Sequence, residues 1–135
     1  MLAKKAAMKA KKAKRVVSAT FDMALIIKKS WVDLILNGAK IWEIRGAPTS
    51  CRGPVFLAAS GKKTLVGRVT ITNCFEIGHD DLPKYVHQHC IADCSIVRYK
   101  RVFAWALEGA ERFEVPREYT HARGAITWVK LPRVQ

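Results

Sequence analysis

The first 20 residues of the chain contain no acidic side chain, and Asp22 carries the first carboxylate. No stretch approaches the roughly 20 consecutive apolar residues that a membrane-spanning helix requires, so we expect no membrane partner. The N-terminus also lacks the apolar core of a secretory signal. With only 4 cysteines in 135 residues, a dense disulfide framework is excluded, and we expect reduced thiols in an intracellular compartment.

Basic residues, in contrast, are abundant and unevenly distributed. The chain contains 24 Lys and Arg against 11 Asp and Glu, and seven of these cations precede residue 21. They are Lys4, Lys5, Lys9, Lys11, Lys12, Lys14 and Arg15. We predict a basic, flexible arm over residues 1–20, disordered until it meets a polyanion, and one folded domain over residues 21–135. The domain keeps 17 cations and all 11 acids, and its net charge of +6 favours nucleic acid as the partner over a role in solubility alone.

Two other functions remain open for the arm. The cluster over residues 11–15, KKAKR, suits a nuclear address. A cationic start without acids is also typical of an organellar transit peptide, although such peptides prefer Arg and Ser to Lys. We therefore expect an intracellular protein, nuclear or cytoplasmic, with a mitochondrial location as the alternative.

The periodicity of the apolar residues predicts an α+β domain. Short apolar or alternating runs predict strands over residues 24–28, 41–45, 54–59, 65–77, 102–107 and 125–131. Ser30 as N-cap and Gly38 at the C′ position bound a short helix, and a second short helix is expected from Asp81. Gly67 predicts a bulge or close backbone approach, and Pro116 is expected to break the chain. These elements favour a closed mixed β-barrel with one or two short helices over a parallel βαβ sheet.

Residues 38–45, GAKIWEIR, contain the pattern G-x-K-x-x-E-x-R directly after the predicted helix SWVDLIL. This arrangement resembles the ASCH domain, a PUA-like family. The similarity continues through residues 52–53, the strand VFLAAS and residues 65–69, and more weakly to residue 131. The resemblance implies a PUA-like mixed β-barrel with a crevice beside the motif strand, which relatives use to hold nucleic acid or a modified base. It also implies an association with RNA metabolism or transcription-coactivator complexes.

Three charged residues of the motif are the first candidates for a site. Strand alternation places Glu43 and Arg45 on one face, with Lys40 at the entry of the strand. In a binding site Lys40 and Arg45 would contact phosphates or a base, and Glu43 would accept from a base edge or orient Arg45. The alternative is a partly buried ion pair that only orients the strand. Both interpretations can hold, because a charge placed to bind must itself be held in position.

Further candidates flank the motif strand. They are the cations Lys62, Lys63 and Arg68, the indoles of Trp31 and Trp42, and the loop residues Tyr119, His121 and Arg123. The cations would extend a basic track, the indoles would stack on bases, and the loop would close the crevice. The alternatives are a solvated loop, core packing and scattered polar residues. We expect Trp105 and Trp128 to belong to the core.

We expect no cofactor and no metal. The segment over residues 87–94 contains two His and two Cys, but structural zinc sites usually take their ligands from two separated pairs. A ribonuclease of this family is disfavoured because the sequence shows no carboxylates clustered at metal-ligand spacing; Asp80 and Asp81 stand alone.

A nucleoside amidohydrolase is the second enzymatic alternative that the resemblance implies. In the branch acting on acylated cytidine the motif runs G-x-K-T-x-T-x-R, and here Glu43 occupies the position of the catalytic Thr. The distant Glu of that branch has no counterpart near residues 86–94. A carboxylate beside Lys40 is also expected to hold the amine protonated, the wrong state for a base or nucleophile.

The sequence therefore predicts a binding module rather than an enzyme; Lys40 and Glu43 would be the catalytic candidates of an enzyme. We expect a monomer that binds RNA or single-stranded nucleic acid through the crevice, with DNA as a further option. A structural subunit of a ribonucleoprotein, using the same features, remains the third alternative.

Overall fold

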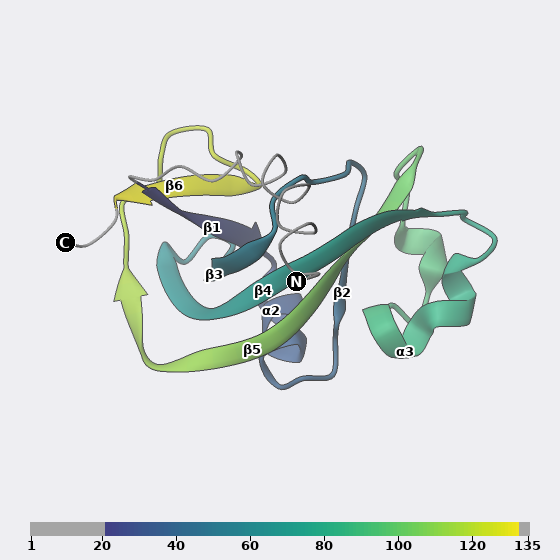
Figure 1. The fold of residues 1–135 in the computed structure, drawn as a ribbon, viewed down its shortest axis with the longest axis horizontal. Coiled ribbons are helices and arrows are strands. Elements are labelled where there is room, and N and C mark those ends of the chain that lie inside the picture. The colour runs from purple at the N-terminus through teal and green to yellow at the C-terminus, as the bar shows by residue number, and fades with distance from the viewer. Residues whose placement is uncertain (1–20, 133–135) are drawn as a thin grey trace, which may run out of the picture.

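The computed structural model describes residues 21–132, and the predicted basic arm over residues 1–20 lies outside them. Six strands and four short helical segments follow one another along this part of the chain (Figure 1). In order they are β1 (Phe21–Ile27), α2 (Lys29–Leu36), β2 (Trp42–Arg45), β3 (Gly53–Ala59), β4 (Thr64–Ile77), η2 (Leu82–Tyr85), α3 (Val86–His89), η3 (Cys94–Ile96), β5 (Val102–Glu118) and β6 (Trp128–Pro132).

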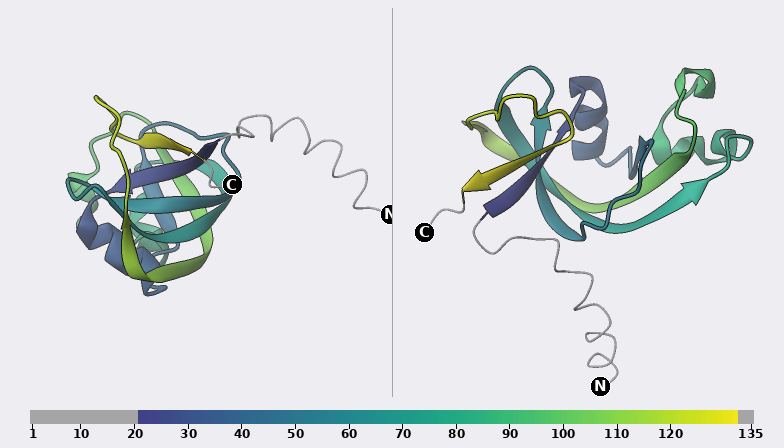
Figure 2. Two further views of the ribbon diagram at one scale, coloured as in Figure 1. Left: turned by 90° about the vertical axis from the view of Figure 1, so that its left-hand side faces the viewer. Right: turned by 90° about the horizontal axis from the view of Figure 1, so that it is seen from above.

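The strands form one curved sheet in the order β2-β5-β4-β3-β1-β6. β1 and β3 are parallel, and the other neighbouring pairs are antiparallel. The sheet curls around itself with α2 lying against it, as Figure 2 shows, but within residues 21–132 no strand pairing joins the edge strands β2 and β6. The predicted α+β, PUA-like mixed barrel with short helices is confirmed, except that the barrel is not closed.

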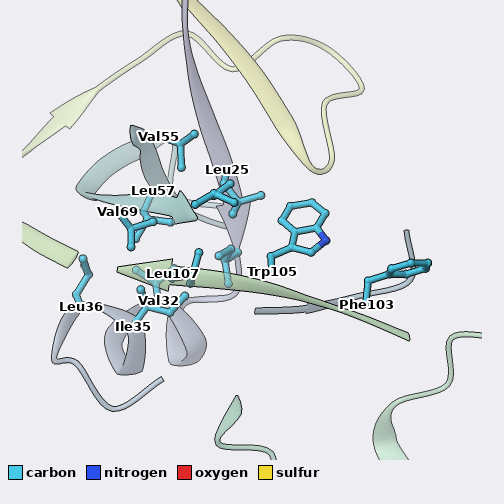
Figure 3. Packing of buried hydrophobic residues seen from close by; sticks show 12 residues of the cluster. Leu25, Val32, Ile35, Leu36, Val55, Leu57, Val69, Phe103, Trp105 and Leu107 are labelled. Atoms are coloured by element: carbon cyan, nitrogen blue, oxygen red, sulfur yellow. The ribbon is translucent and has the colours of Figure 1, made fainter. Parts of the chain in front are cut away.

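The main core lies between α2 and the sheet (Figure 3). Val32 and Ile35 on one face of α2 join a cluster with residues of β1, β3, β4 and β5. The first part of β5, residues 102–107, is apolar on both faces because Trp105 and its alternating neighbours enter this cluster, whereas Val102 and Ala104 enter a second one. Trp105 is buried and stacks on Trp128, with ring centroids 5.9 Å apart. The prediction that these two indoles belong to the core is confirmed.

The helix α2 differs from the prediction at its N-terminus and agrees with it at its C-terminus. Its N-cap is Lys28, and no side chain caps it, so the prediction of Ser30 as N-cap is wrong. The helix starts earlier because Trp31 N and Val32 N both donate to the carbonyl oxygen of Lys28, at 3.0 Å. Gly38 has φ +88°, a left-handed conformation, as the C′ prediction required.

The sequence predicts two features in the long strand pair β4–β5, a bulge or close approach at Gly67 and a chain break at Pro116, and the structure contains only the first. A Cβ at Gly67 would come within 2.5 Å of Glu111 O and 2.6 Å of Leu36 Cδ2, and the pairing register shifts there, so the predicted bulge and close approach are confirmed. The predicted break at Pro116 is wrong. Between Arg112 and Arg117 the pairing passes from Gly67 to Leu65, so the intervening residues bulge out and Pro116 has no ladder hydrogen bond to donate.

The segment between β4 and β5 carries η2, α3 and η3 and lies at one end of the molecule, beside β2 (Figure 1). The predicted helix after Asp81 is therefore present as the short pieces η2 and α3. The four cysteines are free thiols. No helix within residues 21–132 has both the length and the apolarity to cross a bilayer.

Candidate functional site

Arg45, the last residue of β2, connects the two sides of the opening in the sheet. Its Nη2 donates to the carbonyl oxygen of Ile26 in β1 at 2.8 Å, and its Nη1 donates to Oγ1 of Thr127, just before β6, at 3.5 Å. We call the gap between β2 and the end of β1 the seam. Because a guanidinium carries five N–H donors in a fixed fork, one side chain can replace backbone hydrogen bonds that are missing here.

Glu43 joins Arg45 and Lys40 beneath the seam. Nε of Arg45 donates to Oε2 of Glu43 at 2.8 Å, which confirms that the two side chains share one face of the strand. Nζ of Lys40 lies 3.7 Å from Oε1 of Glu43, donates to the carbonyl oxygen of His89 at 2.7 Å and lies 4.6 Å from the ring centroid of Trp31. We call Lys40, Glu43 and Arg45 the seam triad; Lys40 is 2% exposed and Glu43 5%.

Burial decides the electrostatics of Lys40. Desolvation lowers the pKa of its ammonium, and the carboxylate of Glu43 opposes this shift without cancelling it. Glu43 thus acts in the expected direction and favours the protonated amine, but the cost of burying the charge, which the sequence does not reveal, outweighs it. Every buried polar side-chain atom in residues 21–132 has a hydrogen-bond partner, so no buried atom of the seam triad is left without one.

A cleft of about 290 Å³ opens beside the seam triad, and we call it the seam cleft. Besides the triad, its lining comprises Ile26, Ile27, Lys28, Trp31, Ile44, Ser60, Ile91, Ile96, Val97, Tyr99 and Ile126. Lys40 and Glu43 are buried and Arg45 is partly buried, whereas Ile96, Tyr99 and Ile126 are exposed. The cleft therefore has a charged floor and apolar outer walls.

Sequence reasoning missed the outer part of this cleft. Lys28, Ser60, Ile126 and the walls after α3 come from four separate segments, and their spacing along the chain gives no hint that they meet. One signal was present: residues 98–101, RYKR, surround an aromatic ring with three cations, a pattern typical of nucleic-acid contacts. The ring of Tyr99 lies against Gly46, the residue after Arg45. A Cβ at this position would come within 2.5 Å of Tyr99 Cδ1, so only glycine leaves room for the ring there.

Only one of the two predicted stacking indoles lies at the cleft. Trp31 lines it, with the Lys40 ammonium over its ring. Trp42 packs elsewhere, with its ring centroid 5.0 Å from that of Phe75 and 5.1 Å from that of Tyr85. Since Trp42 alternates with Glu43 along β2, its side chain leaves the strand on the opposite face.

The predicted cations are dispersed. Lys63, in the turn between β3 and β4, lines a neighbouring hollow of about 230 Å³. Arg68 lines a third hollow, of about 270 Å³, together with Arg52. Lys62 and Arg123 are exposed and line neither the seam cleft nor the hollow of Lys63. The basic track predicted for these residues is thus not one continuous surface feature of the cleft.

The predicted loop residues Tyr119 and His121 hold the loop itself together. The hydroxyl of Tyr119 lies 2.9 Å from Nδ1 of His121, and Nε2 of His121 lies 3.0 Å from the carbonyl oxygen of Ala125. Because a carbonyl oxygen only accepts, Nε2 carries the hydrogen and Nδ1 accepts from Tyr119. His121 lines the hollow of Lys63, but its ring nitrogens are already occupied.

His89 is fully buried, and its two ring nitrogens bond to the backbone. Nε2 donates to the carbonyl oxygen of Leu82 at 2.8 Å, and Nδ1 accepts from Ile91 N at 2.9 Å. Within residues 21–132 no three His, Cys, Asp or Glu side chains gather as metal ligands would. His89 instead positions its own carbonyl oxygen, which accepts from Lys40.

Lowering the pH from 7.5 to 5 is expected to destabilise the fold through His89. Desolvation lowers the pKa of this imidazole, opposed by the hydrogen bond to Leu82 and supported by the nearby Lys40 charge. The unfolded chain therefore binds a proton first, and the free energy of unfolding falls as the pH drops below the ordinary histidine value of about 6.5, by at most about 1.4 kcal/mol per pH unit. Urea unfolding at several pH values measures this slope. The variant His89→Gln should lose it, and His87→Gln, an exposed neighbour, should keep it; a slope that survives His89→Gln contradicts the assignment.

Comparison with known proteins agrees with the observed fold. The crystal structure of ASCH from Zymomonas mobilis superimposes with a TM-score of 0.62 at 13% sequence identity, covering 72% of this chain and 73% of that one. A serine-to-alanine variant of the Zymomonas mobilis protein superimposes with a TM-score of 0.69 at 11% identity, over 87% of this chain and 92% of that one. At such identities the likeness shows the fold alone. No curated protein matches the chain in sequence.

Membership of a family is shown by a match in sequence, which the structural likeness at such low identity does not provide. The model of the ASCH domain matches residues 25–117, from the first strand through almost all of β5, and includes the motif strand with the seam triad. With this match over more than half of its length and a PUA-like sheet of the same kind, the chain belongs to the ASCH domain family.

Proposed function

We propose that the seam cleft binds an unpaired base of single-stranded nucleic acid, with RNA as the first candidate. The observation that carries this proposal is the composition of the cleft: a charged floor with exposed apolar and aromatic side chains around it. Sequence-specific recognition of RNA commonly uses unstacked bases held between apolar walls, with hydrogen bonds at the base edge. The net charge of +13 on the whole chain supplies the attraction for the phosphates.

Each part of the cleft has a role in this proposal. Arg45 uses three of its five N–H groups on Glu43, Ile26 and Thr127, so two remain for an acceptor on a base. Glu43 has both oxygens directed at Arg45 and Lys40, and it orients Arg45 rather than contacting the base. Lys28 and Ser60 line the cleft and are exposed, and in this proposal they contact phosphate.

One observation favours the amidohydrolase as a second candidate, namely the lowered pKa of Lys40. Against it, Nζ of Lys40 is committed to the carbonyl oxygen of His89 at 2.7 Å, and Glu43 stands where that branch has its Thr. Incubation with acylated cytidine and detection of free cytidine tests this candidate directly. A role as a structural subunit of a ribonucleoprotein uses the same surface and differs only in the partner.

Binding to labelled 12-nucleotide single-stranded RNA, followed by fluorescence anisotropy, tests the proposed function. We expect affinity to fall steeply with salt and to be weaker for duplex RNA. The double variant Lys28→Gln/Lys63→Gln should lower the affinity about tenfold at physiological salt and flatten the salt slope, because two phosphate contacts are removed. Lys84→Gln/Lys130→Gln changes the net charge equally, away from the cleft and the hollow of Lys63, and should have a smaller effect. Salt-independent binding, or equal effects of the two double variants, contradicts the proposal.

A further inference from the structure

We propose that the seam cleft is one half of a groove that takes two successive nucleotides of a single strand, with Ile126 inserted between their bases. This inference rests on the proposed function. Its basis is the hollow of about 230 Å³ that adjoins the seam cleft of about 290 Å³. The two share Ile26, Ser60 and Ile126 as lining residues, so they lie on either side of a common wall.

Ile126 forms the exposed part of that wall. At 80% exposed, it is the most exposed of the large apolar side chains in residues 21–132. A single exposed isoleucine is ordinary on a protein surface, but Ile96 and Tyr99 are exposed around the same cleft. Three exposed apolar side chains at one opening indicate a surface that an apolar or aromatic ligand covers.

The backbone holds Ile126 in place although its side chain is exposed. On one side, the carbonyl oxygen of Ala125 accepts from Nε2 of His121 at 3.0 Å. On the other side, Thr127 O accepts from Ile26 N at 2.9 Å and Thr127 Oγ1 lies 3.5 Å from Nη1 of Arg45. An apolar side chain on a backbone fixed at both neighbours can enter between two stacked bases at a low entropic cost.

The two compartments differ in their chemistry. The seam cleft contains the guanidinium of Arg45, which keeps two N–H donors for a base edge. The adjoining hollow is lined by Gly61, Ala125 and His121, and both ring nitrogens of His121 are used within the loop. The hollow therefore offers apolar and ring surface without a free donor or acceptor on the imidazole. We expect base selectivity at the seam cleft and tolerance at its neighbour.

Cations flank the common wall as a linking phosphodiester requires. Ser60 lines both compartments, Lys28 lines the seam cleft and Lys63 lines the hollow. All three side chains are exposed. A phosphate at Ser60 would therefore lie between two ammonium groups, with one base on each side of Ile126. Such a step must be unstacked and unpaired, which a regular duplex does not provide.

Competition by small RNA fragments tests this inference on the full chain. Labelled 12-nucleotide single-stranded RNA is displaced by ApA, CpC or UpU and by the matching 5′-mononucleotides. We expect the best dinucleotide to compete at about tenfold lower concentration than its mononucleotide, because the second base binds at a high effective concentration. Charge alone predicts the reverse order, since a mononucleotide carries more negative charge than a dinucleotide with one phosphodiester.

The variant Ile126→Ala should weaken competition by the dinucleotide much more than competition by the mononucleotide and so remove the advantage of the dinucleotide, because the dinucleotide alone places a base on each side of this side chain. Val115→Ala is the matched control, because Val115 is 73% exposed and lines neither compartment. Both residues are exposed, so both variants should keep the melting temperature of the parent. If dinucleotides compete no better than mononucleotides, or if Ile126→Ala leaves their advantage intact, the two-compartment groove is wrong while RNA binding stands. If the labelled RNA does not bind at all, the proposed function itself fails.

Discussion

The variant Glu43→Gln is expected to lose about 3–5 kcal/mol of unfolding free energy, a large part of the stability of a domain of this size. Glu43 is 5% exposed and is the carboxylate that faces both Lys40 and Arg45, at 3.7 Å and 2.8 Å. A neutral amide of nearly the same shape leaves two cations at the seam without their counter-charge. The loss comes from burial of unpaired charge and not from lost volume. Chemical denaturation monitored by tryptophan fluorescence measures it.

Glu76→Gln is the matched control for this prediction. The carboxylate of Glu76 accepts from Nη2 and Nε of Arg101 at 2.6 Å and 3.0 Å, as good a geometry as at the seam. Its side chain is 46% exposed and that of Arg101 64%, so water can replace the partner. Exposed ion pairs contribute little, and Glu76→Gln should leave the free energy of unfolding almost unchanged. Equal losses in the two variants would show that burial does not decide the strength of the seam triad.

The result also bears on how Lys40 and Arg45 are tested as ligand contacts. Both are held by internal partners, so their replacement by Ala changes stability together with binding. The exposed residues Lys28, Lys63 and Ile126 provide the cleaner test of binding. The two interpretations of the motif, an orienting ion pair and a binding site, are thus compatible: the ion pair is observed, and it forms the floor of the cleft in which binding is proposed.

Replacing the seven cations of residues 1–20 by glutamine is expected to have the largest effect on affinity. Each cation that neutralises a phosphate of a single strand contributes about 0.7 to the slope of log affinity against log salt. Seven such contacts contribute up to about 5, which corresponds to about a thousandfold over a fourfold change in salt. The measurement is the salt dependence of binding to 12-nucleotide single-stranded RNA, with the parent and variant compared at equal salt. The preference among dinucleotides should persist, since the two compartments proposed to read it lie within residues 26–126.

A chain with the order of residues 1–20 scrambled is the control for this effect. It keeps the charge and the length, so it should bind with the slope of the parent if the arm acts through charge alone. A scrambled arm that binds like the glutamine variant would show that the arm recognises its ligand by sequence. Unchanged salt dependence in the glutamine variant would remove the arm from nucleic-acid binding, and a targeting role would then be the remaining interpretation of its charge.

Much of the fold was accessible from local patterns in the sequence. Alternation and apolar runs located all six strands, because burial of one or both faces of a strand leaves a period that a single segment records. Gly38 and Gly67 predicted a positive φ and a close backbone approach, because both depend on the absence of a Cβ at one position. The prediction of a chain break at Pro116 was wrong because Pro116 lies in a bulge, where no ladder hydrogen bond requires its nitrogen as a donor. That bulge depends on the pairing of β4 with β5, which a local pattern does not record.

The sequence by itself determined the strands, the motif at residues 38–45, the excess of positive charge and the shared face of Glu43 and Arg45. Only the tertiary structure decided that Arg45 bridges an open seam, that Lys40 lies buried on the carbonyl oxygen of His89, and that Tyr99 and Ile126 line one cleft. The physical reason is that local periodicity records which side of an element is buried, whereas the neighbours across a cleft come from segments up to 100 residues apart. Their contact depends on how the sheet curls, and that curvature results from packing of the whole domain.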